Sequence, residues 1–411
     1  MSRPEAVAVR VWCELSGASV EVGTAYVTER RGNRRGVVSA RFVYDEGYVR
    51  RSDAFAVSPD LPLADGGGTT EGLPGALADS APDRWGRNLI QKGWRSNGPA
   101  SDGRPTAPLE VDFLLGVSDV TRQGALRYTV GESGFLADGH SVPKLIELPR
   151  LLHAADVAAN DGVDDGAAVQ ELLDAGSASL GGARPKASVR DGDRLFIAKF
   201  PHRADEWNVM AWEKVALDLA ERAGLRSTPR RMVDVGGRSV LLVERFDREG
   251  DRRLPYISAM SLLGSQDGES RDYLEIAEAI GDHGGTVLDD LVELWHRIAF
   301  SVAINNVDDH LRNHGFLRSG SGWSLSPVFD VNPSPEPEAG RVTSIAFAVT
   351  RRNALASLLD SAGSFGMTAD QAAAQWARIR SVVSDWRAVA RVNGIAESEI
   401  RRFAPVFDAD L

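Results

Sequence analysis

The chain has 411 residues, of which 43% are hydrophobic and 26% charged, so it is long enough for two or three domains with sizeable cores. Its formal net charge of −11 argues against binding nucleic acid through an overall positive field, so we expect any DNA contact to go through a partner. A single cysteine, Cys13, excludes an internal disulfide, and the sequence shows neither a signal-peptide pattern nor an apolar run of roughly 20 residues, so we expect a cytoplasmic protein.

Residues 1–133 predict a small β-rich domain. Alternating apolar and polar positions over residues 1–60 are typical of a meander of strands. ADGGGTTEGLPG (64–75) predicts a loop, and DSAPDRWGRNLIQKGWR (79–95) predicts a helix. VDFLLGVSDVTRQGALRYTV (111–130) predicts a short helix that leads into a strand, and GESGFLADGHSVPK (131–144) a linker.

From Glu147 the chain predicts two helices, a glycine-rich loop, and then a strand, a helix and a hairpin. The strand is RLFIAKF (194–200), the helix spans residues 205–225, and the hairpin is RMVDVGGRSVLLVERF (231–246). These elements predict a mixed sheet with one helix against it. Apart from residues 305–332, the remainder of the chain predicts mostly helices.

The glycine-rich stretch GSASLGGARPKAS (176–188) has the composition of a phosphate-binding turn. Glycines allow backbone N–H groups to turn toward an anion, and Lys186 adds a positive charge. Only five of the 47 Lys and Arg residues are lysines, so a retained lysine favours a task that suits a compact ammonium group. The stretch is not a P-loop motif, and an ordinary β-turn is the alternative interpretation.

Lys199 shares the alternation of Leu195 and Ile197, so we expect its side chain to point to the buried face of the strand. A buried ammonium group requires an anionic partner. The candidates are Glu206, Glu213 or a bound phosphate, and the alternative is an edge lysine that reaches water.

INNVDDHLRNHGFL (304–317) crowds polar residues at the end of a long apolar run, where they either cap a helix or carry chemistry. One interpretation is a metal site, because His310 and His314 are four residues apart and could face one ion with Asp308 or Asp309. However, Leu311 stands where a zinc protease has its glutamate.

The other interpretation is a kinase catalytic loop. Asp308 and Asn313 have its D-x-x-x-x-N spacing, in which the aspartate orients a hydroxyl nucleophile and the asparagine holds a metal. GFLRSGSGWSLSPVFD (315–330) predicts two short strands that lead to Asp330, where a second metal-binding aspartate is expected. Each residue alone could cap a helix or form a turn. The glycine-rich loop, strand lysine, helix glutamate, hairpin end and these two loops nevertheless occur in the order of a kinase fold.

With these motifs the sequence resembles the HipA-type serine/threonine kinases, toxins of bacterial type II toxin–antitoxin systems, over nearly its whole length. SLGGARPKA is similar to the family's glycine-rich loop, FIAKF to its ATP-lysine strand and LLVERFDR to its hinge. NNVDDHLRNHGFL and LSPVFDVNPSP are similar to its catalytic and metal-binding loops, and PGALADSAPDRWGR and DFLLGVSDVTRQGALRY to its small N-terminal domain.

The resemblance implies an α+β, protein-kinase-like two-lobed fold with a small β-rich N-terminal domain and a mostly helical C-terminal lobe. It implies a HipA-like N-terminal domain at residues 1–133, a kinase N-lobe-like region at 147–246 and a helical C-lobe at 247–411.

Carried over position by position, the resemblance makes Asp308 the catalytic aspartate, Asn313 and Asp330 the magnesium ligands and Lys199 the phosphate-binding lysine. Ser179 matches the family's regulatory autophosphorylation serine, with Ser177 as a nearby alternative. Asp309 and His314 are expected only to brace the loop. The residues expected at the nucleotide are Gly181, Gly182, Ala183, Arg184, Pro185, Lys186, Lys199, Glu244, Arg245, Phe246, His310, Leu311, Arg312, Asn313, Phe329 and Asp330.

The function implied is an ATP- and Mg²⁺-dependent protein kinase that phosphorylates a translation component such as an aminoacyl-tRNA synthetase and pairs with a DNA-binding helix-turn-helix antitoxin. The alternatives are an antitoxin-binding corepressor subunit with little kinase activity, and a small-molecule kinase. The presence of Lys199, Asp308, Asn313 and Asp330 together favours an active kinase, because a scaffold has no need of all four.

Overall fold

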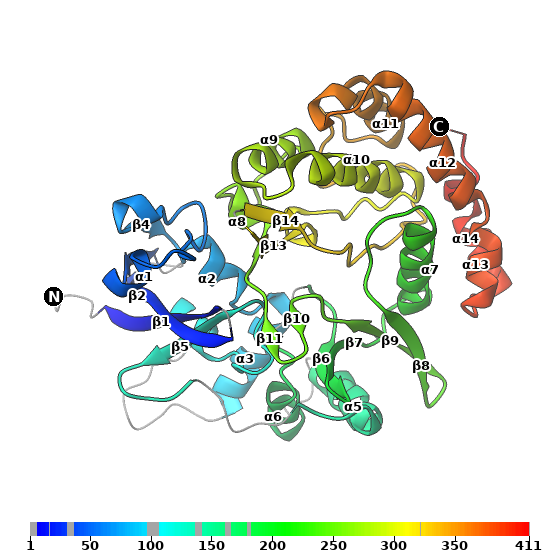
Figure 1. Ribbon diagram of the computed structural model, residues 1–411. Helices are drawn as coiled ribbons and strands as arrows, with labels where there is room; N and C mark the ends of the chain where they lie inside the picture. Colours follow the sequence, from blue (N-terminus) through cyan, green and yellow to red (C-terminus); the bar gives the residue numbers. More distant parts are fainter. Residues whose placement is uncertain are drawn as a thin grey trace. The chain divides into compact units, whose positions relative to one another are not determined.

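The computed structural model describes residues 6–15, 17–30, 37–96, 107–135, 142–160, 166–178, 182–320 and 322–410. The chain forms two compact units (Figure 1). The first unit consists of Met1–Arg203 and Asp247–Ile257, and the second of Ala204–Phe246 and Ser258–Leu411. The division at residues 133, 147 and 246 that the sequence predicts stays a prediction.

The first unit begins with a five-stranded antiparallel sheet of strand order β4-β3-β2-β1-β5. The alternation in the sequence correctly predicts its first three strands, since Val9, Val11 and Cys13 of β1 are fully buried on one face. β4 lies within residues 64–75, where the sequence predicts a loop. The prediction is wrong here because the glycines and threonines of β4 give no apolar alternation, although the strand pairs with β3 at the edge of the sheet. The strands are β1 (Val7–Leu15), β2 (Ala18–Arg30), β3 (Val37–Tyr44), β4 (Gly67–Glu71) and β5 (Leu126–Val130).

Helices α3 to α6 of the first unit lie where the sequence predicts helices, whereas the short helices α1 and α2 were not predicted. α3 begins after Asp83, whose Oδ1 accepts the N–H of Gly86 at 2.7 Å and so caps the helix. Ile90 of α3 packs in one apolar cluster with Phe113 of α4 and with Val117. The helices are α1 (Glu46–Val49), α2 (Gly75–Asp79), α3 (Arg84–Ser96), α4 (Glu110–Leu115), α5 (Leu148–Ala158) and α6 (Gly166–Asp174), with the 3₁₀ turns η1 (Leu63–Asp65) and η2 (Leu145–Glu147).

The glycine-rich segment leads directly into a strand, β6, at residues where the sequence predicts a loop. β6 (Lys186–Asp191) pairs antiparallel with β7 (Arg194–Lys199), and its first four residues, KASV, are buried. Small and polar residues at these buried positions hide the strand pattern. Three short strands complete this unit: β10 (Arg248–Glu249), β11 (Arg252–Arg253) and β12 (Tyr256–Ser258), of which the last residue belongs to the second unit.

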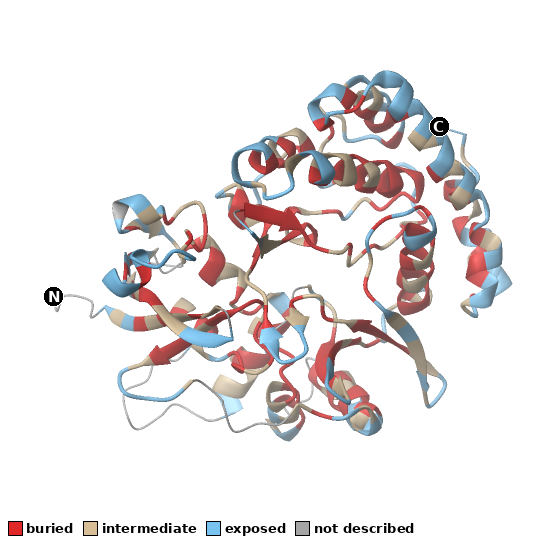
Figure 2. Ribbon diagram, in the orientation of Figure 1, coloured by how far each residue is buried: buried red, intermediate tan, exposed pale blue. Residues whose placement is uncertain are grey.

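The second unit is mostly helical, as predicted, around the long helix α10, which is buried along most of its length (Figure 2). Trp212 of α7 stacks on Phe403 of α14 with ring centroids 3.8 Å apart, and Trp386 of α13 stacks on Phe407 at 4.7 Å. These aromatic pairs join the C-terminal helices to α7. The helices are α7 (Val209–Arg222), α8 (Ala259–Leu262), α9 (Tyr273–His283), α10 (Val287–Ala303), α11 (Arg351–Asp360), α12 (Ala369–Ser384), α13 (Trp386–Val392) and α14 (Glu397–Phe407), with η3 (Leu311–Asn313) and η4 (Ala362–Phe365).

Two antiparallel hairpins accompany these helices and confirm two predictions. β8 (Arg230–Val235) and β9 (Arg238–Glu244) form the hairpin expected at residues 231–246. β13 (Gly315–Ser319) and β14 (Gly322–Leu325) form the one expected between the polar loop and Asp330.

Candidate active site

The polar loop begins where α10 ends, and a buried arginine fixes that end. The guanidinium of Arg351 donates to the carbonyl oxygens of Val302 at 2.8 Å, Ala303 at 2.6 Å and Val406 at 2.8 Å. The last carbonyls of a helix have no partner within it, so Arg351 satisfies two of them. Burial, with Arg380 and Arg341 nearby, lowers the pKa of Arg351 to about 10.

Asn305 turns the chain out of the helix and joins two segments of the site. Its φ of 56° lies in the left-handed region, which asparagine tolerates better than most residues. Its side-chain amide donates to the carbonyl oxygens of Ser334 at 3.1 Å and Glu336 at 2.9 Å. The N–H of Val342 donates to the carbonyl of Val307 at 2.9 Å. The segment that follows Asp330 is therefore hydrogen-bonded to the polar loop.

Asp308 and Asp309 are adjacent in the sequence but lie in opposite environments. The side chain of Asp308 is exposed, whereas that of Asp309 is buried. Partial desolvation, together with the negative charges of Asp330 and Asp309, raises the pKa of Asp308 above its ordinary value, against the opposing effect of His310. Asp308 thus presents a carboxylate at the surface of the loop and lies close enough to Asp330 for their charges to interact.

Asp309 is held under the loop by a set of donors. It accepts from the hydroxyl of Tyr273 at 2.5 Å and from Ser301 at 3.0 Å, and Nε2 of His314 lies 3.2 Å from its Oδ1. Arg341 donates to Ser301 at 2.8 Å and so extends the network. Burial alone raises the pKa of Asp309, but His314, Tyr273 and Arg341 outweigh it and hold this pKa well below the ordinary value. These contacts are the bracing expected of Asp309 and His314.

The zinc interpretation fails on local geometry. His310 precedes the single 3₁₀ turn η3 in an extended conformation, and His314 follows that turn, so the two histidines do not share one face of an α-helix. His314 is turned toward Asp309 in the core. Among the residues that the structure describes, no cluster of three or more His, Cys, Asp or Glu side chains is arranged to hold a metal.

Asn313 closes the loop onto Asp308. Its Nδ2 donates to the backbone carbonyl of Asp308 at 3.2 Å, and its backbone N–H donates to His310 at 2.8 Å. The amide nitrogen therefore faces the loop backbone, and the amide oxygen is the group of this side chain that can bind a metal ion. Of the other loop residues expected at the nucleotide, Leu311 is buried and Arg312 pairs with Asp267 at 2.9 Å.

Asp330 follows the β13–β14 hairpin at a strained backbone position. Its φ of 55° is uncommon for a residue other than glycine and marks a point where the surrounding structure fixes the chain. Asn332 donates to its Oδ1 at 3.3 Å. The preceding Phe329 packs against Phe246 with ring centroids 5.2 Å apart, so two residues expected at the nucleotide are in contact.

The hinge segment ends β9. The N–H of Glu244 donates to the carbonyl of Pro229 at 2.9 Å, so this N–H is used within the hairpin. Arg245 is buried and Phe246 half-buried.

In the first unit, both faces of β7 carry buried residues, so the expectation that Lys199 points to a buried face stays a prediction. On the face of Lys199, Leu195 is buried, and so is Lys186, which lies opposite Lys199 on β6. Lys199 and Ile197 are half-buried, whereas Phe196, Ala198 and Phe200 on the other parity are buried. Both parities of RLFIAKF are apolar, so alternation could not separate the faces. Of its expected partners, which lie in the second unit, Glu206 pairs with Arg402, and Glu213 is buried on α7.

Lys186 is not an exposed loop lysine. It is the first residue of β6, only 2% exposed, and its Nζ lies 2.8 Å from Oδ2 of Asp83. Sequence reasoning missed Asp83, whose pattern signals only a helix cap. It also missed Asn305 and Arg351, because each acts through contacts distant in sequence.

Within the glycine-rich segment, Ser179 and Gly181 lie outside the described residues. Gly182 has a φ of 111°, which requires glycine. Ala183 is exposed, Arg184 half-buried and Pro185 buried. The alternative phosphorylation site, Ser177, is fully buried, which argues against it as a phosphate acceptor in this conformation.

Comparisons with known proteins agree over both units. A family described as the HipA-like C-terminal domain matches residues 178–389, and the HipA N-terminal domain matches residues 22–103. Comparison with curated protein sequences finds no match. No helix among the described residues is long and apolar enough to span a membrane.

Among solved structures, a chain of the Shewanella oneidensis MR-1 toxin–antitoxin complex of HipA, HipB and operator DNA aligns with a TM-score of 0.69 at 17% identity, covering 98% of this chain and 100% of its own. The Helicobacter pylori proinflammatory kinase CtkA aligns over 54% of this chain and 91% of its own, at 15% identity and a TM-score of 0.39. The predicted fold is confirmed: α+β and protein-kinase-like, with a β-rich N-terminal part and a mostly helical C-terminal part.

Proposed function

The chain belongs to the HipA family, and from this we propose that it is an ATP- and Mg²⁺-dependent serine/threonine protein kinase and the toxin of a type II toxin–antitoxin pair. The observation that carries the proposal is the arrangement of Asp308, Asn313 and Asp330. Asn313 is hydrogen-bonded to the backbone of Asp308, and partial desolvation together with the charge of Asp330 raises the pKa of Asp308.

The donor set at this site fits magnesium. Two interacting carboxylates and an amide oxygen are hard oxygen ligands, and mutual repulsion between the carboxylates is relieved by a cation. Magnesium in kinases uses few protein ligands and completes its shell with water and phosphate oxygens. Asn313 and Asp330 would hold the ion, which neutralises charge on the phosphates when it is bound.

The chain's own residues supply positioning. Asp308, exposed at the end of a fixed helix, accepts the hydrogen of the acceptor hydroxyl, whose oxygen attacks the γ-phosphorus of ATP. The bond between that phosphorus and the β–γ bridging oxygen breaks, ADP leaves, and the proton passes to Asp308. Lys199 places a charge on the phosphates, and the backbone of Glu244–Phe246 contacts the adenine.

By family analogy the acceptor is a translation component such as an aminoacyl-tRNA synthetase, and Ser179 is the autophosphorylation site. A phosphate on Ser179 adds about 1.5–2 negative charges beside the glycine-rich segment and switches the kinase off. The partner is a DNA-binding helix-turn-helix antitoxin, supported by the solved complex that contains HipB and operator DNA and by the acidic net charge of this chain.

The test is phosphoryl transfer from labelled ATP, with purified chain and a lysate. We expect label on protein rather than on small molecules, and none after Asn313→Ala or Asp330→Ala. Lys199→Ala should weaken ATP binding without unfolding the chain. Mass spectrometry should find phosphate on Ser179 in the wild type and none in Asp308→Asn. Unchanged transfer by Asn313→Ala or Asp330→Ala would remove the kinase assignment, and label on small molecules alone would favour a small-molecule kinase.

A further inference from the structure

We propose that the first turn of α3, through Asp83 and Gly86, positions both ends of the glycine-rich segment 178–186 and thereby controls how tightly the chain binds nucleotide. The inference rests on the proposed function, in which this segment contacts ATP. Asp83 and Gly86 are positioning residues, because they act through the segment and not on the substrate.

At the C-terminal end of the segment, one carboxylate joins the helix to the strand. Oδ1 of Asp83 accepts the N–H of Gly86 at 2.7 Å, and its Oδ2 lies 2.8 Å from Nζ of Lys186. The side chains of Lys186 and Asp83 are 3% and 10% exposed, so this ion pair is shielded from water and from screening by salt. Asp83 therefore fixes the point at which β6 begins.

The same pair compensates a repulsion within the β6–β7 hairpin. Lys186 and Lys199 are directly opposite in the register of the two strands. Residues opposite each other lie on one face with their Cβ atoms about 4.5–5.5 Å apart, and like charges there are unfavourable. The carboxylate of Asp83 offsets the charge of Lys186, and its loss would increase the repulsion between Lys186 and the lysine expected to bind phosphate.

At the N-terminal end of the segment, α3 approaches the backbone so closely that only glycine fits. A Cβ added to Gly86 would lie 2.7 Å from the carbonyl oxygen and 2.8 Å from the Cα of Ala178, both main-chain atoms. Ala178 also belongs to the apolar cluster that contains Ile90 of α3. One helical turn therefore contacts the residues directly before and directly after the region 179–185.

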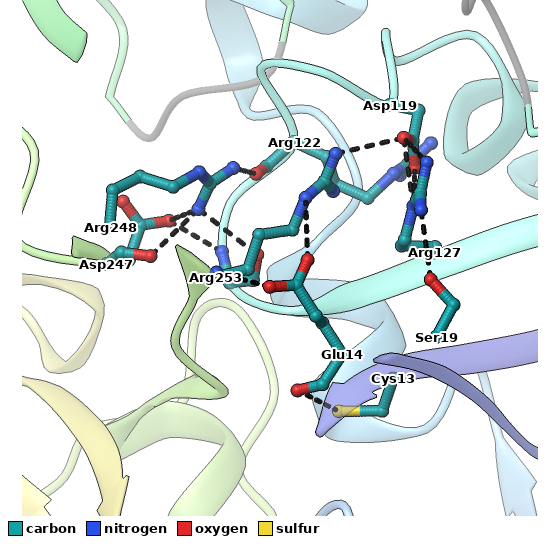
Figure 3. Close-up of polar contacts among 10 residues, drawn as sticks. Cys13, Glu14, Ser19, Asp119, Arg122, Arg127, Asp247, Arg248 and Arg253 are labelled. Atoms are coloured by element: carbon teal, nitrogen blue, oxygen red, sulfur yellow. Dashed lines mark hydrogen bonds and ion pairs between the residues drawn. The ribbon is translucent and has the colours of Figure 1, made fainter. Parts of the chain in front are cut away.

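A second N-terminal element supports this role. A Cβ added to Gly176 would lie 2.3 Å from the hydroxyl of Thr121, so the turn after α4 packs against the residues that enter the segment. The same turn holds the residues that follow the hinge: the N–H of Gly124 donates to Oδ2 of Asp247 at 2.7 Å, and Arg248 donates to the carbonyl of Arg122 at 2.6 Å (Figure 3). The N-terminal motif PDRWGR therefore contacts both ends of the glycine-rich segment, and the motif TRQG contacts the residues that enter this segment and those that follow the hinge.

The first test removes the charge of Asp83 and keeps its shape. Asp83→Asn retains the acceptor that caps α3 but loses the ion pair with Lys186. We expect the dissociation constant for a fluorescent ATP analogue and the KM for ATP to rise about tenfold or more, with a smaller change in kcat. In the nucleotide-free protein, peptides that cover residues 172–178 and 186–191 should exchange amide hydrogens faster. The double variant Asp83→Asn with Lys186→Gln, a neutral hydrogen-bonded pair, should recover this protection.

The second test compares two glycines of one helix. Gly86→Ala should accelerate the same exchange and weaken nucleotide binding, because the backbone at Ala178 must move. Gly93→Ala is the matched control: its Cβ would lie 3.1 Å from the Cδ1 atom of Leu173, the mobile end of a side chain, and meets no backbone atom of the segment. Nucleotide binding and the exchange of residues 186–191 should therefore keep their wild-type values.

The outcomes separate the two proposals. Wild-type protein that binds no nucleotide contradicts the proposed function and with it the control of nucleotide binding that is inferred here. If folded Asp83→Asn and Gly86→Ala exchange their amide hydrogens as slowly as the wild type, the inference is refuted. It is also refuted if exchange is faster but the affinity for nucleotide is unchanged. If Asp83→Asn fails to fold, the comparison of nucleotide affinity and amide exchange between Gly86→Ala and Gly93→Ala decides the question.

Discussion

The buried carboxylate of Asp309 offers a sharp test of how the polar loop is held. Asp309→Ala removes the acceptor of the Tyr273 and Ser301 hydrogen bonds, at 2.5 and 3.0 Å, and leaves His314 without its anionic partner in the core. Hydrogen bonds to a charged group contribute about 1.5–3 kcal/mol each without being additive, and Asp309 accepts two of them. We therefore expect Asp309→Ala to lower the free energy of unfolding by about 3–5 kcal/mol. Asp309→Asn keeps an acceptor and should cost about 2 kcal/mol.

The pH dependence of this loss follows from the direction of the pKa shift. The pKa of Asp309 is lowered in the folded state from its ordinary value of 3.8, so the charged form stabilises the fold above that pH. This stability is lost as the pH falls below about 3.8, where the unfolded chain binds a proton more readily than the folded one. The difference between wild type and Asp309→Asn should be constant between pH 5 and 7 and should narrow below pH 4. Urea unfolding monitored by tryptophan fluorescence measures it.

The adjacent Asp308 is the matched control. Its side chain is exposed and its pKa is raised, so Asp308→Asn should leave the free energy of unfolding within about 0.5 kcal/mol of the wild type or slightly above it, while it abolishes phosphoryl transfer. Equal losses of stability in the two variants, or a loss in Asp309→Asn that does not depend on pH, would refute this account of the loop.

Three further expectations concern stability and reactivity. Arg351→Met should destabilise the chain by about 3 kcal/mol or more, measured by urea unfolding, because three buried carbonyls each lose a hydrogen-bond donor. Arg351→Lys should not restore the stability, since one ammonium group cannot reach all three carbonyls. Phe347→Gly should raise the free energy of unfolding by about 0.5–1 kcal/mol, because Phe347 is 92% exposed at a φ of 67°; a lower melting temperature would contradict the assigned backbone strain. Burial raises the pKa of Cys13 to about 12, so its thiol should react with a disulfide reagent at pH 8 only in denaturant, and rapid reaction of the native chain would show that β1 opens.

The sequence predicts elements wherever a single periodicity dominates. The strands of the N-terminal sheet and the helix α10 have clear alternation or a clear apolar stripe, and both are found where expected. β6 was missed because Lys186 and Ser188 occupy buried strand positions. The charge of the buried Lys186 is compensated by Asp83, about one hundred residues earlier.

The candidate site likewise has local features, which the sequence predicts, and long-range contacts, which it does not predict. The D-x-x-x-x-N spacing and the hairpin that leads to Asp330 are local, so the sequence predicts them. The contacts of Arg351 with the end of α10, and of Asn305 with residues 334 and 336, join segments about 30–50 residues apart and leave no local signal. The D-x-x-x-x-N spacing and the family resemblance select Asp308 over Asp309, but neither predicts that Asp308 is exposed and Asp309 buried.

These long-range contacts explain how a loop of polar residues can hold a defined geometry. α10 ends in carbonyl groups that Arg351 satisfies, Asn305 reverses the chain at a positive φ, and the charge of Asp309 gathers donors beneath the loop. These contacts restrain the backbone on either side of Asp308 in the sequence while its side chain stays exposed, so the carboxylate is positioned without being buried. Positioning of this kind lowers the entropy that a reaction must otherwise lose when a hydroxyl and a phosphoryl group are brought into line. A loop held only by its own turns would leave that entropy to be lost in every turnover.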